Sequence, residues 1–359
     1  MSAIKLGAWG LGRIGSIHLE HFAAQTGMYE VVAACDVERE KVERAVAQYG
    51  CAGYTCADDL LADPNVELVI IATRSLTHVE NALQALAAGK FVLLEKPIAQ
   101  SFGEIEQLRQ ADRNHPGKLF FLHNHRFEPA MLQIFDIVRS GILGDIFQVK
   151  LHRSHGFCRR ADWQAYLRYG GGQLSNWGSH IIDHALQFIG GPVKDIWGNL
   201  KAVNAIGDAE THVKAVLTGE NGIIVDLEIS NNIALSGAFC TVYGSRGSLV
   251  CADEKHIRLR YLDPGFEFPE AAAKTDSPPL GGGYFSDTDL PWRDETRTVE
   301  TDTPMWVYVE IATARHLYRT LREGAPFPIA NADALEVSRI IQVIKAQNPE
   351  FMWDFQHQD

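Results

Sequence analysis

The 359-residue chain lacks long hydrophobic runs, an excess of positive charge and any internal repeat. No apolar run approaches the roughly 20 residues that cross a bilayer, which argues against a membrane-spanning protein. Acidic residues outnumber basic ones, 45 to 33, for a formal net charge of -12. This balance argues against nucleic acid or an anionic membrane as a partner, because both are bound through clustered Lys and Arg. The first apolar segment begins within a few residues of Met1 without a charged leader, so we expect a cytoplasmic protein.

The six cysteines lack the paired spacing of a metal site. Most have apolar neighbours, which favours reduced thiols over disulfides or metal ligands, and we expect no metal. With 46% hydrophobic and 22% charged residues, the composition is that of an ordinary globular protein. The length exceeds that of a usual single core and predicts two domains.

What the sequence does contain is a glycine turn between a probable strand, residues 4–9, and a probable helix that ends near residue 27. Gly10 allows the tight turn, Gly12 lets a pyrophosphate approach the backbone, and Gly15 lets helix and strand pack. Phosphates would lie at the helix N-terminus, beside Arg13 and Ile14. The context predicts a dinucleotide site, although an ordinary glycine turn gives the same pattern.

Asp36 follows a second apolar strand, residues 29–35, about 20 residues beyond the glycines. An acid here binds the hydroxyls of the adenosine ribose, and its charge disfavours the additional phosphate of NADP. Asp36 could also cap the helix predicted over residues 37–49, and Arg39 nearby weakens the argument against NADP. We expect NAD, with NADP as the less favoured cofactor.

Strands and helices alternate up to residue 122. Further strands are predicted over 66–72, 91–94 and 119–122, and helices from 77 to 88 and from 101 to 114, each opening with a capping box. This order predicts a parallel, doubly wound sheet with ligands at the carboxyl ends of its strands. Lys96 lies at such an end, ahead of Pro97, which favours an active-site role over that of a surface charge.

The second half follows a different pattern. A helix over 129–140 and many short alternating segments predict an α+β domain built on a large, open, mostly antiparallel sheet. Its exposed face is a candidate subunit interface, so we expect a homodimer or homotetramer.

Residues 262–304, rich in Pro, Gly and Asp, are consistent with a lid, an oligomer arm or disorder. Helices follow over 305–322 and 332–346, and the aromatic C-terminus (Phe351, Trp353, Phe355) is expected to pack.

Three glycines, 170–172, precede a segment that carries polar side chains with helical spacing. If it is helical from Leu174, then Asn176, His180 and Asp183 share one face. Such a stripe is often simply solvated, but the glycines allow the backbone to approach a ligand closely.

Together, these motifs resemble the glucose-fructose oxidoreductase, inositol dehydrogenase and MocA (Gfo/Idh/MocA) family. The resemblance rests on the glycine turn, Asp36, Thr73 with His78, the Glu-Lys-Pro run at 95–97 and the Arg-Phe-Glu-Pro run at 126–129. It covers nearly the whole chain and implies a Rossmann domain over 1–124 and a substrate and oligomerisation domain over 125–359.

The resemblance also implies individual roles. Lys96 would reach both the nicotinamide ribose and the substrate, the Lys96-Pro97 bond would be cis, and Thr73, His78 and Glu95 would line the cofactor. His180 matches the catalytic histidine of the family.

The chain departs from the family pattern in two places. Residues 74–75 are Arg-Ser where relatives often have Pro-Asn, and Asn176 stands where many members have Asp. A neutral amide can orient a substrate but cannot stabilise an imidazolium by charge.

Four further side chains are candidates for the substrate pocket: Asp183, Arg126, Trp163 and Arg160. Arg160 could equally be a solvated charge, and Trp163 a core residue.

We therefore expect an NAD-dependent oxidoreductase that transfers a hydride between nicotinamide and a secondary hydroxyl or ketone of a sugar, sugar derivative or cyclitol. His180 would act as acid/base, and Lys96 would stabilise the reacting oxygen. Two alternatives fit the same resemblance: an NAD-dependent glycoside hydrolase that works by transient oxidation and elimination, and a non-catalytic NAD-binding regulator.

Overall fold

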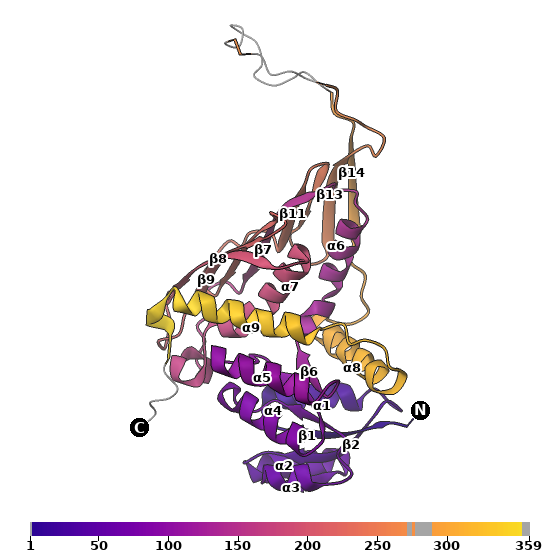
Figure 1. The fold of residues 1–359 in the computed structure, drawn as a ribbon, viewed down its shortest axis with the longest axis vertical. Helices are drawn as coiled ribbons and strands as arrows, with labels where there is room; N and C mark the ends of the chain where they lie inside the picture. The colour runs from indigo at the N-terminus through magenta and orange to yellow at the C-terminus, as the bar shows by residue number, and fades with distance from the viewer. Residues whose placement is uncertain (1, 271–274, 277–288, 354–359) are drawn as a thin grey trace.

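The computed structural model describes residues 2–270, 275–276 and 289–353, and these form two sheets joined by helices (Figure 1). The first sheet is parallel, with strand order β3-β2-β1-β4-β5-β6 within the described residues. Its strands are β1 Ile4–Trp9, β2 Tyr29–Cys35, β3 Ala52–Tyr54, β4 Leu68–Ile71, β5 Phe91–Glu95 and β6 Leu119–Leu122. Its helices are α1 Arg13–Ala23, α2 Arg39–Tyr49, α3 Ala57–Ala62, α4 His78–Ala87 and α5 Phe102–Asn114. The predicted doubly wound Rossmann sheet is confirmed.

The second sheet is mostly antiparallel, with order β14-β13-β12-β11-β7-β10-β9-β8 among the described strands. Only the β10–β7 pair among them is parallel. The strands are β7 Ile146–Ser154, β8 Val193–Lys201, β9 His212–Gly219, β10 Ile224–Ser230, β11 Cys240–Gly244, β12 Gly247–Cys251, β13 His256–Leu262 and β14 Trp292–Thr298. The helices of this half are α6 Pro129–Arg139, α7 Ser179–Ile189, α8 Met305–Glu323 and α9 Asn331–Ala346. This confirms the predicted α+β domain.

Short helical turns connect several of these elements. They are the 3₁₀ turns η1 Ser75–Thr77, η2 Asn124–Phe127, η3 Trp163–Ala165, η4 Leu167–Tyr169 and η6 Pro349–Phe351, and the π-helical turn η5 Leu174–Gly178.

Burial follows the layer arrangement. All four residues of β4 are buried, as expected for a central parallel strand covered on both faces. In β9 only alternate residues, Val213, Ala215, Leu217 and Gly219, are buried. Helices α6 and α7 lie on one side of the second sheet (Figure 1), and α7 packs on β7, β9 and β10.

The C-terminal helices return to the first sheet. Ala314, Leu317 and Tyr318 of α8 join the core cluster that contains Ile4 and Phe22, and the hydroxyl of Tyr29 donates to the carbonyl of Ala314 at 2.7 Å. Figure 1 shows α8 and α9 lying between the two sheets. The division at residue 124 stays a prediction, because the core around the first sheet is completed by residues from the end of the chain.

The two predicted capping boxes have different outcomes. Ser101 Oγ accepts from the amide of Glu104 at 3.2 Å, so that prediction is confirmed. The prediction at Thr77 is wrong: its hydroxyl bonds Thr73 and Asn81 instead, because α4 is entered through the turn η1.

The stretch 262–304 contains a strand that the sequence did not predict. β14 pairs with β13 over seven residues, but its sequence is polar and its side chains are mainly exposed, so it shows no apolar alternation. Residues 271–274 and 277–288, where a lid or arm was considered, lie outside the described residues.

At the C-terminus Phe351 is buried as expected, whereas Trp353 is 40% exposed. Phe355 lies outside the described residues.

Among the described helices, none combines the length and apolar character that crossing a membrane requires. All six cysteines are free thiols, with Cys56 and Cys158 exposed.

Candidate active site

The glycine turn leaves the start of α1 open. A Cβ on Gly10, which has φ +97°, would lie 2.6 Å from the carbonyl of Ala72, and one on Gly15 would lie 1.9 Å from the carbonyl of Gly10. A Cβ on Gly12 would meet no atom within 4 Å among the described residues. Gly12 is the N-cap of α1 and no side chain caps it, so the first amides of the helix remain available to a pyrophosphate.

Asp36 lies against this turn. Its Oδ2 accepts from the amide of Leu11 at 2.7 Å, and its Oδ1 accepts from the amide of Glu38 at 2.9 Å. The alternative that Asp36 caps the next helix is wrong, because the N-cap of α2 is Glu38. A carboxylate has about four lone-pair sites, so the bonds to the turn still leave Asp36 able to accept from ribose hydroxyls.

His78 supports the backbone around Lys96. Its ring is buried, with Nδ1 2.9 Å from the carbonyl of Pro97 and Nε2 3.2 Å from the carbonyl of Thr73. Burial lowers its pKa. The Lys96-Pro97 bond is cis, as the resemblance implied. The predicted contacts of Thr73 and His78 with the cofactor stay predictions.

Glu95 belongs to a buried charged network that the sequence did not reveal. His18 of α1 lies 2.7 Å from Glu310 of α8 and 3.5 Å from Glu95. Burial opposes a charge on His18, but the two carboxylates outweigh it and raise the pKa of His18 to about 10. Glu310 also accepts from Asn124 at 2.6 Å. The sequence signal was a histidine on the otherwise apolar, buried face of α1.

Lys96 and Asn176 meet across the two domains. Nζ of Lys96, at the end of β5, donates to Oδ1 of Asn176 in η5 at 2.9 Å. Burial lowers the pKa of Lys96, although the neighbouring carboxylate of Glu95 opposes this effect. The family's Asp position is therefore occupied by an amide that is engaged with Lys96.

His180 lies one turn further along the chain and is 5% exposed. The expected α-helical spacing does not hold throughout, because residues 174–178 form a π-helical turn before α7 begins at Ser179. The centroid of the His125 ring lies 4.0 Å from that of His180, and that of Trp177 lies 5.7 Å away. Burial, and then the charges of His125 and Lys96, hold the pKa of His180 well below its ordinary value.

Asp183 and Arg126, both predicted to bind substrate, pair with each other. Nε of Arg126 donates to Oδ2 of Asp183 at 3.0 Å, and a second bond joins Nη2 to Oδ1. Asp183 is fully buried. Arg126 also donates to the carbonyl of Pro328 at 2.9 Å and lies 3.2 Å from Asp333. The substrate-binding roles of Arg126 and Asp183 stay predictions. The geometry supports a structural role, in which this ion pair joins η2 to α7.

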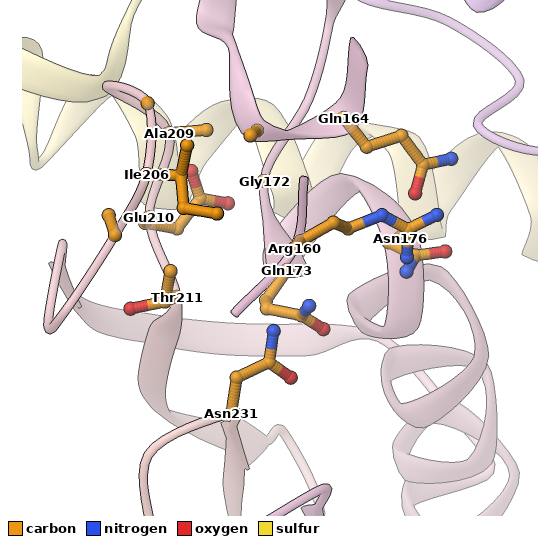
Figure 2. Close-up of a pocket in the computed structure, with 13 residues that line it drawn as sticks. Arg160, Gln164, Gly172, Gln173, Asn176, Ile206, Ala209, Glu210, Thr211 and Asn231 are labelled. Carbon is orange, nitrogen blue, oxygen red and sulfur yellow. The ribbon is translucent and has the colours of Figure 1, made fainter. Parts of the chain in front are cut away.

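A small polar pocket adjoins Asn176 (Figure 2). Among the side-chain amides that line it, those of Gln173 and Asn231 point toward one another in this view. Burial raises the pKa of Glu210, which also lines the pocket, to about 7. The lining residues are Arg160, Gln164, Ala165, Gly172, Gln173, Asn176, Ala205, Ile206, Gly207, Ala209, Glu210, Thr211 and Asn231. The sequence did not predict three of these lining residues, Gln173, Glu210 and Asn231, because they follow no recognisable spacing.

The remaining candidates are placed as follows. Arg160 lines the pocket, and its Nε donates to Asp162 at 2.8 Å. Trp163 is half-buried and does not line this pocket. Arg74 lies over the ring of Tyr169, and the hydroxyl of Ser75 donates to the carbonyl of Tyr169. The two residues that depart from the family pattern, 74 and 75, therefore contact the second half of the chain. Within the described ranges, no group of three or more His, Cys, Asp or Glu side chains could hold a metal ion.

An open helix start on a Rossmann sheet, together with a part-buried lysine and a buried histidine from the two halves of the chain, is typical of a nicotinamide-dependent oxidoreductase. Residues 4–123 match the oxidoreductase family with an NAD-binding Rossmann fold, Gfo/Idh/MocA, and residues 131–250 match the C-terminal domain of the same family. The chain belongs to the Gfo/Idh/MocA family of NAD(P)-dependent oxidoreductases.

Individual relatives are distant. An uncharacterized oxidoreductase of Schizosaccharomyces pombe is 33% identical over 196 residues, which cover 54% of this chain and 53% of that protein. The scyllo-inositol 2-dehydrogenase (NADP(+)) IolW of Bacillus subtilis is 26% identical over 361 residues, 98% of this chain and 95% of IolW. Among solved structures, an NAD-binding protein from Listeria innocua aligns with a TM-score of 0.77 at 22% identity, covering 97% of this chain and 96% of that one. That structure supports the fold alone.

Proposed function

We propose that the protein transfers a hydride between NAD and a secondary hydroxyl or ketone of a sugar, sugar derivative or cyclitol. The observation that carries this proposal is the arrangement of Lys96, Asn176 and His180 at the junction of the two domains. We assign His180 the role of proton acceptor and Lys96 that of cationic donor, next to polar side chains that suit hydroxyl groups.

His180 and Lys96 have complementary roles in the proposed reaction. NAD, when bound, would supply the hydride chemistry that the side chains of the chain cannot provide. His180 takes the hydroxyl proton as general base, and its lowered pKa keeps the ring neutral and ready to accept. Lys96 donates to the same oxygen and stabilises the negative charge that develops there. Removal of hydride and proton from the alcohol leaves a ketone.

Three observations support a polyol as substrate and NAD as cofactor. The pocket beside Asn176 is lined by amide, carboxyl and guanidinium groups, which pair with hydroxyls, and the full-length relative IolW acts on an inositol. Asp36 at the end of β2 disfavours a ribose phosphate, in contrast to the NADP named for IolW.

We also propose a homodimer or homotetramer that uses the outer face of the second sheet. Trp197 of β8 and Val216 of β9 are paired on that face, and Trp197 is 53% exposed. Ile224 of β10 adds a further exposed apolar side chain. Light scattering coupled to gel filtration should therefore give a multiple of the 39.8 kDa chain mass.

The test is a screen of sugars and inositols with NAD and with NADP, in which nicotinamide absorbance is followed. We expect NADH to form with a cyclitol or sugar, and Lys96→Met to abolish turnover. The control Lys5→Met, on an exposed lysine near the start of β1, should have wild-type activity. Release of an aglycone from a glycoside without net NADH would contradict the proposal and indicate the glycosidase alternative. Full function of Lys96→Met would indicate a regulator.

A further inference from the structure

The turn that carries Asn176 is capped from outside its own segment. Turn η5 runs directly into α7, and Gln173, the residue before it, makes no capping bond with its side chain among the described residues. Residues 170–172 are all glycine, so no serine, threonine or aspartate stands next to the turn to take its first amides. Buried amides at a helix start are costly without an acceptor, so the acceptor must come from a distant residue.

Glu210 supplies this acceptor from the segment that leads into β9. Its carboxylate oxygen Oε1 accepts from the amide of Leu174 at 2.9 Å, across 36 positions of the chain. Its backbone carbonyl accepts from the amide of Gln173 at 3.1 Å. Glu210 is 1% exposed. A single buried residue therefore binds the first two amides of the turn.

The third glycine of the run makes room for this carboxyl group (Figure 2). A Cβ on Gly172, which has φ +108°, would lie 2.2 Å from each carboxyl oxygen of Glu210. A side chain at position 172 would therefore displace the carboxyl group from the amide of Leu174. Gly172 thus has a role in capping the turn that the sequence could not reveal.

The charge that compensates Glu210 comes from α9. Lys345 is 6% exposed, and its Nζ donates to Oγ of Ser175, the second residue of the turn, at 3.0 Å. Burial raises the pKa of Glu210 to about 7, and the charge of Lys345 is the largest influence that opposes this effect. Burial likewise lowers the pKa of Lys345, and the charge of Glu210 opposes it. The two residues hold successive positions of η5 and stabilise each other's charge.

We propose that Glu210, with Lys345 as its compensating charge, is a positioning residue that holds η5 so that Oδ1 of Asn176 stays on Nζ of Lys96. The contact between Asn176 and Lys96 is 2.9 Å long and links the two halves of the chain. The amide of Asn176 donates to the carbonyl of Gly172 at 3.0 Å, so a shift at the start of the turn moves Asn176 with it. The importance of this contact for turnover rests on the proposed function.

The first test is hydrogen–deuterium exchange of the whole chain, followed by mass spectrometry at pH 8, where most Glu210 carboxyl groups are ionised. In Glu210→Ala, residues 173–178 should exchange about 10- to 100-fold faster, because an amide bonded to a charged acceptor has lost its partner. Glu210→Gln keeps an acceptor without the charge, so its exchange should lie between those of the wild type and Glu210→Ala. The residues of β4 should exchange at the wild-type rate in both variants.

The matched control is Glu220→Ala. Glu220 follows the opposite end of β9 and is exposed, so this variant should leave the exchange of residues 173–178 unchanged. Gly172→Ala should instead reproduce the effect of Glu210→Ala, because its Cβ displaces the carboxyl group. If Glu210→Ala does not fold, Glu210→Gln serves for the same comparison.

The second test measures the contact between Asn176 and Lys96 by trace acetylation of lysines with acetic anhydride. An ammonium group that loses its acceptor is a free amine for a larger fraction of the time, so Lys96 should react about tenfold faster in Glu210→Ala and faster in Asn176→Ala as well. The double variant should react no faster than Glu210→Ala, because both changes break the same contact. Lys90, a buried lysine bonded to two backbone carbonyls, should keep its rate in all three variants.

The outcomes separate this inference from the proposed function. Unchanged exchange of residues 173–178 in a folded Glu210 variant would overturn the role of Glu210 as a cap. Additive increases in the acetylation of Lys96, or a parallel increase at Lys90, would overturn its action through Asn176 and indicate a merely structural role. A screen of sugars and inositols without NADH formation would overturn the proposed function and leave both measurements valid. With a substrate, Glu210→Ala should lower kcat while the affinity for NADH stays at the wild-type value.

Discussion

The buried pair between Arg126 and Asp183 allows a sharp distinction between a structural and a substrate-binding role. Arg126 is 7% exposed and Asp183 fully buried, and two hydrogen bonds join them. Asp183→Asn removes the charge and one of the two acceptors that Asp183 offers, while the contacts of Arg126 with Pro328 and Asp333 stay in place. Breaking a buried ion pair costs about 3–5 kcal/mol, so we expect a loss of this size in the free energy of unfolding.

The matched control is Asp333→Asn. Asp333 contacts the same arginine at 3.2 Å, but its side chain is 40% exposed. Exposed pairs contribute less than about 1 kcal/mol, so this variant should be nearly as stable as the wild type. Urea unfolding of both variants, with KM measured alongside, gives the comparison.

The pH dependence provides a second check. Arg126 holds the pKa of Asp183 below its ordinary value, with burial opposing the shift. A carboxyl group with a depressed folded-state pKa stabilises the fold above its unfolded pKa, and this contribution is lost as the pH falls further. The stability difference between wild type and Asp183→Asn should therefore shrink below about pH 4. A raised KM with unchanged stability would refute the structural role and favour substrate binding.

Three further predictions concern the acid/base centre, the buried network and the glycine turn. Asn176→Asp should retain turnover and shift the acid limb of kcat/KM to higher pH, since a carboxylate favours protonation of His180; complete loss of NAD binding would contradict this placement. The pKa of His18 is raised from 6.5 to about 10, so its stabilising contribution is complete below pH 6.5 and lost as the pH rises through 10. The stability advantage of wild type over His18→Gln in urea should accordingly fall between pH 7 and pH 10, and a constant difference would refute a charged His18. Gly12→Ala should weaken NADH binding, followed by fluorescence, at wild-type thermal stability, whereas Gly15→Ala, with its Cβ 1.9 Å from a carbonyl, should lower the melting temperature.

The parts of the fold that the sequence predicted well are those whose burial is uniform. Strands β1, β2 and β6 have the predicted limits, because each is an apolar run ended by a turn or a polar residue. β14 was missed because an exposed edge strand needs no apolar alternation. The parallel pairing of β10 with β7 depends on strand order, which no local pattern encodes.

The candidate site divides in the same way. Lys96 and His180 could be found because each lies in a recognisable motif. Their neighbours could not: Glu128 and Arg153 are 25 positions apart, and His18 meets Glu310 across 292 positions. Which carboxylate neutralises which cation is decided by packing, so a pairing such as Asp183 with Arg126 cannot be read from spacing.

The return of α8 to the first sheet has a consequence for synthesis on the ribosome. Proteins emerge from the N-terminus, and the leading domain commonly folds first. Here the core around β1 is completed by Ala314, Leu317 and Tyr318, almost 200 residues after the last strand of that sheet. The emerging Rossmann half must wait for these residues with part of its apolar surface uncovered. Nascent chains stalled after residue 124 should therefore be captured by chaperones, and those extended beyond α8 should be released.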